Sequence, residues 1–211
     1  LDTLSNYYDI HKKEQFERLF GHLYIGKNPT PNRNRYLVWR LDFSKIKANP
    51  SIQNIMDDFE FYIYNSIKYF AESYKDFLPV EKLNLYENSC TNSLNSLCNI
   101  VNLSNQKLYV LIDEYDNFIN ELISTGRNED YSRLVTGDGL IKSFFKVLKA
   151  ESGKAIDRVF VTGVTPIMLT DLSSAFNIST DISLDVEYNN LFGFTEVEIK
   201  ELLQRVLEEI K

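Results

Sequence analysis

The stretch that most constrains the fold is residues 107–123, KLYVLIDEYDNFINELI, in the middle of the chain. It begins with a short apolar run from Leu108 to Ile112 and then meets two adjacent carboxylates, Asp113 and Glu114. A short run of β-branched and aromatic residues bounded by polar ones is typical of a strand that is buried on both faces of a sheet. We therefore predict a buried strand with two acidic side chains at its carboxyl end.

Two further apolar runs indicate that this strand belongs to a parallel sheet. Residues 35–43, RYLVWRLDF, include the acid Asp42 at their end, and residues 157–167, DRVFVTGVTPI, stay apolar until they reach Thr162. We interpret all three runs as buried strands. Segments with the helical spacing of apolar residues separate them, at 50–70, 90–101 and 140–150. Because strands that alternate with helices pair in parallel, we predict an α/β fold in three layers, with a parallel sheet between helices on both faces.

The remaining segments carry simpler signals. Residues 1–26 have a helical pattern, residues 124–139 resemble a loop, and residues 183–188 are expected to form a short strand. The last segment begins with a capping box, in which Thr195 is followed three residues later by Glu198. We therefore expect a final helix that starts after Thr195.

Three polar side chains follow the second and third predicted strands. Because the carboxyl ends of parallel strands line one edge of a sheet, Asp113, Glu114 and Thr162 are expected to converge where ligands of open α/β sheets bind. In P-loop NTPases, the acid at such a position holds Mg²⁺ and the next carboxylate can polarise the attacking water. A polar residue on the following strand then senses the γ-phosphate. The alternative is that the two acids are merely solvated and that Thr162 caps its strand before a turn at Gly163.

The composition narrows the class of protein. With 211 residues, 44% of them hydrophobic, the chain can bury the core of one domain with a small appendage. Its formal charge of −7 argues against a protein that binds nucleic-acid phosphates. The sequence contains no run of about 18 apolar residues, so we expect no membrane span, and no signal peptide opens the chain.

Two cysteines, Cys90 and Cys98, lie eight residues apart in a helical pattern. Eight helical residues rise about 12 Å, which is too far for a disulfide on one helix. We therefore expect buried thiols in a reducing compartment and an intracellular protein, cytoplasmic or nuclear.

Several blocks of the sequence resemble one known family. They are IDEYD at 112–116, VFVTGVTPIMLTDL at 159–172 and FGFTEVEIKELL at 192–203, with YLVWRLDFS at 36–44 and LFGHLYI at 19–25. In this order they resemble the AAA-ATPase-like family. These are predicted P-loop NTPase domains, often followed in the full protein by a PD-(D/E)XK nuclease-like region.

The resemblance implies a sheet of the additional-strand P-loop class and a site that uses Mg²⁺ and ATP. Asp113 would be the Walker B acid that acts on Mg²⁺, Glu114 the catalytic carboxylate, and Thr162 the sensor at the end of the next strand. It also implies that residues 1–194 form a partial NTPase core and that residues 195–211 begin the C-terminal lid helix.

One part of the family pattern has no counterpart in this sequence. The family places a Gly-rich loop with Gly-Lys-Ser/Thr before the first helix, but the nearest match is GHLYIGKN at 21–28, with Asn28 where a hydroxyl is needed. A helical pattern precedes this stretch and prolines follow it, so we interpret it as a chance match, like Gly153-Lys154. We expect instead that residues 1–10 form the helix that follows the phosphate loop. On this hypothesis the chain is N-terminally truncated, ATP and Mg²⁺ bind only when the upstream loop is present, and two inner strand edges stay unpaired.

Two classes of function follow. The first is a domain that binds and hydrolyses ATP in the full-length protein, with a nucleotide as its partner. The second is a nucleotide-independent protein-interaction module on a degenerate NTPase scaffold, with self-association or another protein as its partner. A third class, nucleic-acid processing by a downstream nuclease, has no signal within these residues, and a membrane partner is not expected.

Four other charged residues have two interpretations each. Arg127 and Arg133 could act as arginine fingers toward a neighbouring subunit, although solvated loop charges are commoner. Asp42 could lie near the Mg²⁺ edge, but the expected strand order places it on a peripheral strand. For Asp116 we favour a cap on the helix that follows it over a catalytic role.

Overall fold

The computed structural model describes residues 1–47, 49–165, 170–172, 175–191 and 193–209. It divides into two compact units, Leu1–Asn177 and Ile178–Lys211. The boundary of the NTPase core at residue 194, which the family resemblance implies, stays a prediction.

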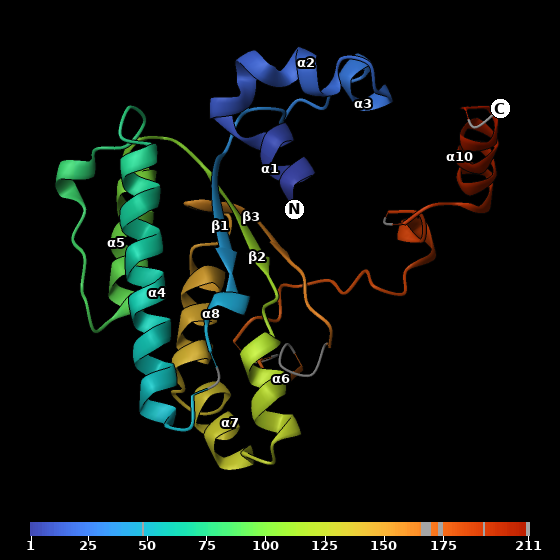
Figure 1. Ribbon diagram of the computed structural model, residues 1–211. Coiled ribbons are helices and arrows are strands. Elements are labelled where there is room, and N and C mark those ends of the chain that lie inside the picture. The colour runs from blue at the N-terminus through green and yellow to red at the C-terminus, as the bar shows by residue number, and fades with distance from the viewer. Residues whose placement is uncertain (48, 166–169, 173–174, 192, 210–211) are drawn as a thin grey trace. The chain divides into compact units, whose positions relative to one another are not determined.

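The first unit is built on a parallel sheet with the strand order β1-β2-β3 (Figure 1). These strands are β1 (Leu37–Asp42), β2 (Leu108–Asp113) and β3 (Ile156–Val161). In register, Leu37 pairs with Leu108 and Asp42 with Asp113, while the register of β2 and β3 shifts between Leu108 and Tyr109. The predicted parallel α/β sheet is confirmed, with the Asp-Glu strand in its centre.

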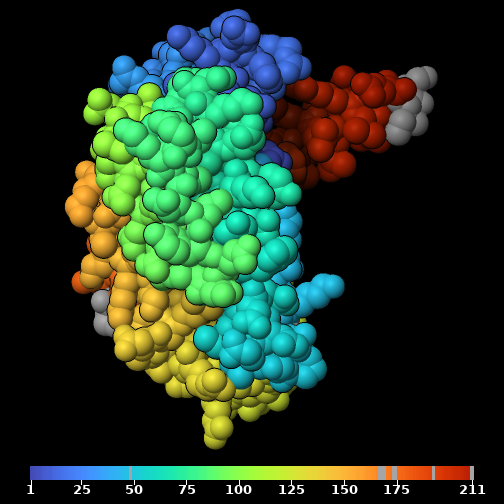
Figure 2. Space-filling view, turned by 90° about the vertical axis from the view of Figure 1, so that its left-hand side faces the viewer, coloured from blue at the N-terminus to red at the C-terminus, as the bar shows by residue number. Residues whose placement is uncertain are grey.

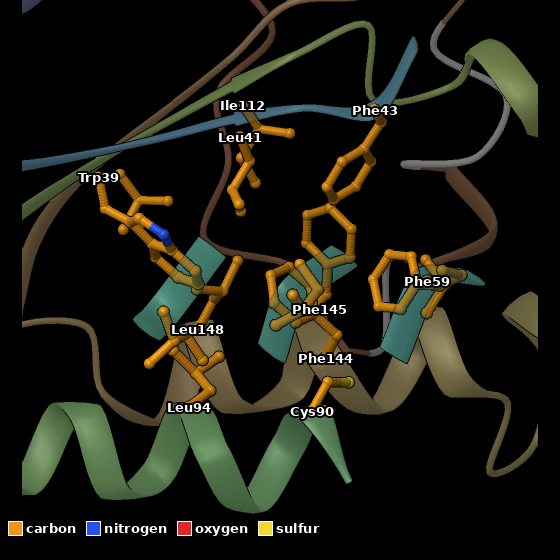
Figure 3. Close-up of a cluster of buried hydrophobic side chains, with 14 of the residues drawn as sticks. Trp39, Leu41, Phe43, Phe59, Cys90, Leu94, Ile112, Phe144, Phe145 and Leu148 are labelled. Carbon is orange, nitrogen blue, oxygen red and sulfur yellow. The ribbon is translucent and has the colours of Figure 1, made fainter. Parts of the chain in front are cut away.

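Helices cover one face of the sheet and form the main core with it. They include α4 (Ile52–Ser73), α5 (Cys90–Leu103) and α8 (Leu140–Ala150). Figure 3 shows side chains of β1 meeting those of α8, with α5 on the far side of α8 from the strand. In Figure 2, α4 and α5 form one continuous surface over this layer. Each large apolar side chain buried here stabilises the fold by about 1.5–3 kcal/mol relative to its exposed state.

Apolar residues at helical spacing explain why α4 forms against the sheet. Ile55, Phe59, Ile63 and Ile67 recur every four residues, and each is fully buried. The same helix covers the outer edge of β1, where Tyr74, just past its end, accepts a hydrogen bond from the Val38 amide at 3.0 Å. Tyr62 accepts one from the Asp42 amide at 2.7 Å. Tyrosine hydroxyls thus satisfy backbone groups that the edge strand would otherwise leave unpaired.

A smaller cluster lies on the second face of the sheet. Side chains of β1 and β2 meet residues of the N-terminal helix α1 (Asp2–Tyr8), and the cluster comprises Tyr36, Val38, Tyr109 and Leu111 with Leu1, Leu4, Tyr8 and Phe160 at its border. The chain then continues through η1 (Ile10–Gln15), α2 (Phe16–Phe20) and α3 (Tyr24–Lys27). The predicted helical segment 1–26 is therefore a series of short helices.

Three expectations about elements were wrong. The region 124–139 is not only a loop, because α6 (Asn117–Ser124) is followed by α7 (Asn128–Val135), which buries two apolar residues. Strand β3 is not buried, since only Ile156 is inaccessible. Residues 183–188 form no strand but contain the short 3-10 helix η4 (Val186–Tyr188).

The second unit contains the helix α10 (Glu196–Glu209). Its predicted capping box is confirmed: the Thr195 amide donates to Glu198 at 2.8 Å and the Glu198 amide donates to the Thr195 hydroxyl at 3.3 Å. None of the residues described in α10 is buried. Among the helices of both units that the structure describes, none is long and apolar enough to cross a membrane.

Both cysteines belong to the core of the first unit, as expected. Cys90 and Cys98 are free thiols with no exposed surface. Burial raises the pKa of both thiols above the ordinary value. The thiolate is the reactive form of cysteine, so these residues serve packing.

Candidate functional site at the carboxyl edge of the sheet

Two of the predicted site residues meet at the carboxyl edge. Beyond the ends of β2 and β3, the Thr162 amide donates to Ile112 at 2.8 Å and the Tyr115 amide donates to the Thr162 carbonyl at 3.1 Å. This pairing places the Thr162 side chain beside Asp113, and its hydroxyl donates a hydrogen bond to the Asp113 carboxylate. The prediction that these two side chains converge is supported by a direct contact.

Glu114 occupies a backbone conformation that side chains rarely adopt. Its φ angle is 51°, in the left-handed region that favours glycine. Such a residue costs of order 1–3 kcal/mol and is found mostly where the surrounding structure imposes it, often at functional sites. Glu114 is half-buried, and no hydrogen bond or ion pair from the described residues reaches its carboxylate. Within that part of the chain, its carboxylate therefore makes no structural contact that would prevent it from binding a ligand or water.

The loop that follows Thr162 lies very close to the acidic turn. A Cβ atom added to Gly163 would stand 2.4 Å from the Asp116 carboxylate and 2.4 Å from the ring of Tyr115. Real Cβ atoms essentially never come this close to other atoms. Glycine is therefore required here for close approach of two segments, which the sequence pattern alone did not indicate.

Asp116 connects these two segments. It precedes α6, but its side chain makes no capping hydrogen bond, so the predicted helix cap is wrong. Its carboxylate instead accepts hydrogen bonds from Thr165 and Asn120, with the Thr165 amide at 2.7 Å and Asn120 Nδ2 at 2.7 Å. The Val164 amide donates to it as well, at 3.1 Å. The sequence gives only a weak signal for this role of Asp116. Asn120 follows it by one helical turn, but Thr165 is distant along the chain.

Burial and hydrogen bonding act in opposite directions on Asp116. Its exposed fraction is 0%, and this burial alone would raise the pKa of the carboxyl. Hydrogen bonds from Thr165, Asn120 and Val164 outweigh burial and leave the pKa below its ordinary value of 3.8. Asp116 is therefore a buried and ionised carboxylate at neutral pH.

Other predicted residues lie apart from this contact. Asp42 pairs with Asp113 in the strand register, but its side chain binds the Ser44 amide at 3.1 Å and it ends the peripheral strand β1. Arg127 donates to the Asn49 carbonyl at 2.5 Å and pairs with Asp130 at 2.6 Å. It therefore joins α7 to the segment after β1 and serves the chain itself.

Arg133 and the two glycine-lysine pairs also lie apart from the contact between Thr162 and Asp113. Arg133 is exposed on α7, so its role as an arginine finger stays a prediction. The stretch 21–28 follows helix α2, and a Cβ on Gly26 would lie 1.7 Å from the carbonyl oxygen of Phe20. Gly153-Lys154 lies in a turn before β3. Neither pair follows a strand and opens a helix in the way a phosphate-binding loop does.

The described residues at this edge supply few ligands for a cation. Within the described ranges, no group of three or more His, Cys, Asp or Glu residues could hold a metal ion. Mg²⁺ is commonly bound by one or two carboxylates, with waters and substrate phosphates as its remaining ligands. Asp113 at an open sheet edge suits that kind of coordination.

Comparison with known proteins assigns the chain to a family. The family described as AAA-ATPase-like, predicted AAA-ATPase, matches residues 1–173. This range contains β1, β2, β3 and the contact between Thr162 and Asp113, whereas the block at 192–203 lies outside it. No curated protein and no solved structure matches the chain. On the match over most of its length, the chain belongs to the predicted AAA-ATPase family.

Proposed function

We propose that the chain contributes the metal-binding and catalytic edge of an ATP-hydrolysing site, which acts in the full-length protein. In this proposal Asp113 is the Walker B acid, Glu114 is the catalytic carboxylate and Thr162 is the sensor. The observation that carries the proposal is the hydrogen bond from Thr162 to Asp113 at the carboxyl edge of the sheet. It joins the ends of two neighbouring strands where ligands of α/β sheets bind.

Each residue has a separate part in the proposed chemistry. Asp113 would hold Mg²⁺, directly or through water, and the ion would neutralise charge that develops on the phosphates. Glu114 orients and polarises the attacking water, for which its carboxylate must be unpaired. Thr162 carries a hydroxyl that rotates, so it can turn from Asp113 toward a phosphate oxygen or the water.

The proposal includes a larger sheet of the additional-strand P-loop type, with helices on both faces. A further strand that carries the phosphate loop would pair with the outer edge of β3. Half-exposure of β3 supports this arrangement, because a strand in the middle of such a sheet would be inaccessible. The loop would then open above the carboxyl ends of β2 and β3, beside Asp113 and Thr162.

Binding and hydrolysis of Mg²⁺-ATP test the proposal with Glu114→Gln. The measurement compares residues 1–211 with a longer form that carries the proposed phosphate-loop strand ahead of residue 1. We expect the form with the phosphate loop to bind and hydrolyse ATP. Glu114→Gln should keep ATP binding and lower the turnover rate by about 100-fold or more, since the general base is lost.

Glu121→Gln is the matched control for this experiment. Glu121 is exposed on α6, close in sequence to Glu114, and its substitution should leave turnover unchanged. Loss of turnover in both variants would contradict a specific role for Glu114. A form that carries the loop but binds neither ATP nor GTP would contradict the proposal as a whole.

A nucleotide-independent interaction module is the second candidate. The observation that favours it is the folding of residues 21–28, the nearest sequence match to a phosphate loop, as a turn after α2 and the short helix α3. In that case the acidic edge would bind no nucleotide, and a protein partner would bind equally well with and without Mg²⁺-ATP.

A further inference from the structure

The acidic turn and the loop after β3 form one hydrogen-bonded unit. Tyr115 contributes twice: its amide donates to the Thr162 carbonyl at 3.1 Å, and its hydroxyl donates to the Thr165 carbonyl. Asp116 contributes through its side chain, which accepts from the amides of Val164 and Thr165. Two segments far apart in sequence are thereby joined by side chains of one turn.

The strongest of these connections is the carboxylate of Asp116. Four groups donate to it: the Val164 amide at 3.1 Å, the Thr165 amide at 2.7 Å, the Thr165 hydroxyl at 3.0 Å and Asn120 Nδ2 at 2.7 Å. Hydrogen bonds to a charged group are about twice as strong as those between neutral groups. The Thr165 hydroxyl also lies 3.0 Å from Asn120 Oδ1 on α6, so its single proton can be donated to either of the two oxygens.

A side-chain amide at position 116 would fit these donors less well than the carboxylate does. The Val164 amide lies 3.1 Å from one carboxylate oxygen and 3.2 Å from the other. The substitution Asp116→Asn would turn one of these oxygens into an NH₂ group. Whichever way the new side chain turned, a donor would face the Val164 amide, and in one orientation it would also face the Thr165 amide. The site therefore favours a group that only accepts hydrogen bonds, because an amide would place a donor beside the Val164 amide in either orientation.

We propose that Asp116 is a positioning residue, which holds the loop 162–165 against the acidic turn and so fixes Thr162 relative to Asp113 and Glu114. Asp116 lies two residues after Glu114, and its partner Val164 lies two residues after Thr162. Rigid coupling over this short distance would keep the positions of Thr162 and Glu114 fixed relative to each other. The catalytic consequence rests on the proposed ATPase function, whereas the coupling itself does not.

Amide hydrogen exchange tests the coupling in the chain of residues 1–211 without any nucleotide. In Asp116→Asn, we expect exchange at Val164 and Thr165 to become at least tenfold faster. The decisive amide is that of Thr162, which Asp116 does not touch and which should also exchange about tenfold faster. Amides of β1, such as Trp39, should be unchanged if the variant is folded. Unchanged exchange at Thr162 in a folded variant would overturn the proposal.

A milder variant and a matched control keep the test decisive if Asp116→Asn unfolds. Thr165→Val removes one hydroxyl from the network and leaves the two amide donors in place, so it should speed exchange at Thr162 by a smaller factor. No change at Thr162 in the folded Thr165→Val chain would then count against the coupling. Asp9→Asn is the control: Asp9 is also buried and accepts from the His11 amide at 2.9 Å. It should not alter exchange at Thr162.

Steady-state kinetics test the catalytic consequence in the ATP-hydrolysing form. Misplacement of a reacting group by about 1 Å can lower the rate about 100-fold. We expect Asp116→Asn to lower kcat by a factor between about 10 and 100 and to change KM for ATP by less than about twofold. A loss confined to KM would overturn a positioning role. If the unsubstituted protein hydrolyses no nucleotide, the proposed function fails, while the exchange experiment still decides the coupling.

A double substitution separates positioning from simple destabilisation. Asp116→Asn with Asn120→Asp moves the negative charge by one helical turn and keeps it beside the Thr165 hydroxyl. It should restore part of the slow exchange at Thr162 and part of kcat, relative to Asp116→Asn alone. A double variant no better than the worse of the two single variants would contradict the proposed network.

Discussion

At the scale of single residues, Gly163 is the most constrained position in the candidate site. Its neighbours Tyr115 and Asp116 leave no room for a Cβ atom. We expect Gly163→Ala to lower the free energy of unfolding by about 1–3 kcal/mol, because the loop must move away from the acidic turn. Urea denaturation would measure this change, with Gly126→Ala as the comparison.

Gly126 separates steric crowding from backbone conformation. Its φ is 74°, but no atom lies within 4 Å of a Cβ placed there. Alanine at this position should therefore cost only the strain of a left-handed backbone, about 1 kcal/mol. If Gly163→Ala costs no more than this variant and leaves Thr162 exchange unchanged, the close approach is less rigid than the distances indicate.

Also at the residue scale, the ionised Asp116 predicts how stability depends on pH. A carboxyl whose pKa is lower in the folded protein stabilises the fold above its unfolded pKa, and this contribution is lost as the pH falls through the folded pKa. The ordinary value is 3.8, and the folded value lies below it. We therefore expect the stability difference between the natural protein and Asp116→Asn to stay constant from pH 7 to about 5. Below about pH 4 it should shrink.

Urea denaturation across this pH range is the measurement, and Asp76→Asn provides the control. Asp76 is exposed, so its substitution should change the free energy of unfolding only slightly. A difference for Asp116→Asn that persists unchanged at pH 3 would show that its carboxyl does not carry the stabilising charge.

At the scale of elements, the two outer strands of the sheet differ in whether side chains bond their outward backbone groups. Tyrosine hydroxyls of Tyr62 and Tyr74 bond the outer backbone groups of β1. For β3, the Thr162 amide points to β2, so by alternation the Val159 and Val161 amides point away from it. Outward backbone groups on an edge strand can pair with a strand of another molecule.

We therefore expect residues 1–211 to self-associate through β3 as concentration rises. Val159→Pro should reduce this association, because it removes an outward N–H without breaking the ladder to β2. Val159→Ala loses part of the same side-chain packing but keeps the N–H, so it should associate like the natural chain. Sedimentation velocity over a range of concentrations gives the comparison. A monomer at every concentration would indicate that the edge of β3 is protected in another way.

Some features of these strands and of the candidate site could be predicted from the sequence, and others could not. The strands β1 and β2 were predictable because each is a run of mostly apolar residues, and such a run indicates a buried strand. Exposure of β3 was not, since it depends on what lies beside the strand. Asp113 and Thr162 were placed at one edge by the rule for parallel strands, and they meet there. The role of Asp116 was missed, because its partners Val164 and Thr165 are brought to it only by the pairing of β2 with β3.

At the scale of the whole molecule, burial is distributed unevenly along the chain. Every buried hydrophobic residue among those described lies at or before Phe176, and the second unit begins at Ile178. Apolar burial is the dominant favourable contribution to folding. The first unit therefore contains the side chains that make its own stable core, together with all three residues of the candidate site.

This distribution predicts that residues 1–177 fold alone with the stability of the full chain. The free energy of unfolding should agree within about 1 kcal/mol, since α10 contributes no buried side chain among its described residues. Thermal and urea unfolding of the two chains provide the measurement, and limited proteolysis should leave a resistant fragment that ends near Asn177. A loss of several kcal/mol on removal of residues 178–211 would mean that the second unit covers apolar surface of the first. In that case the exposed apolar residues of α10, such as Leu203 and Val206, would be the first positions to substitute.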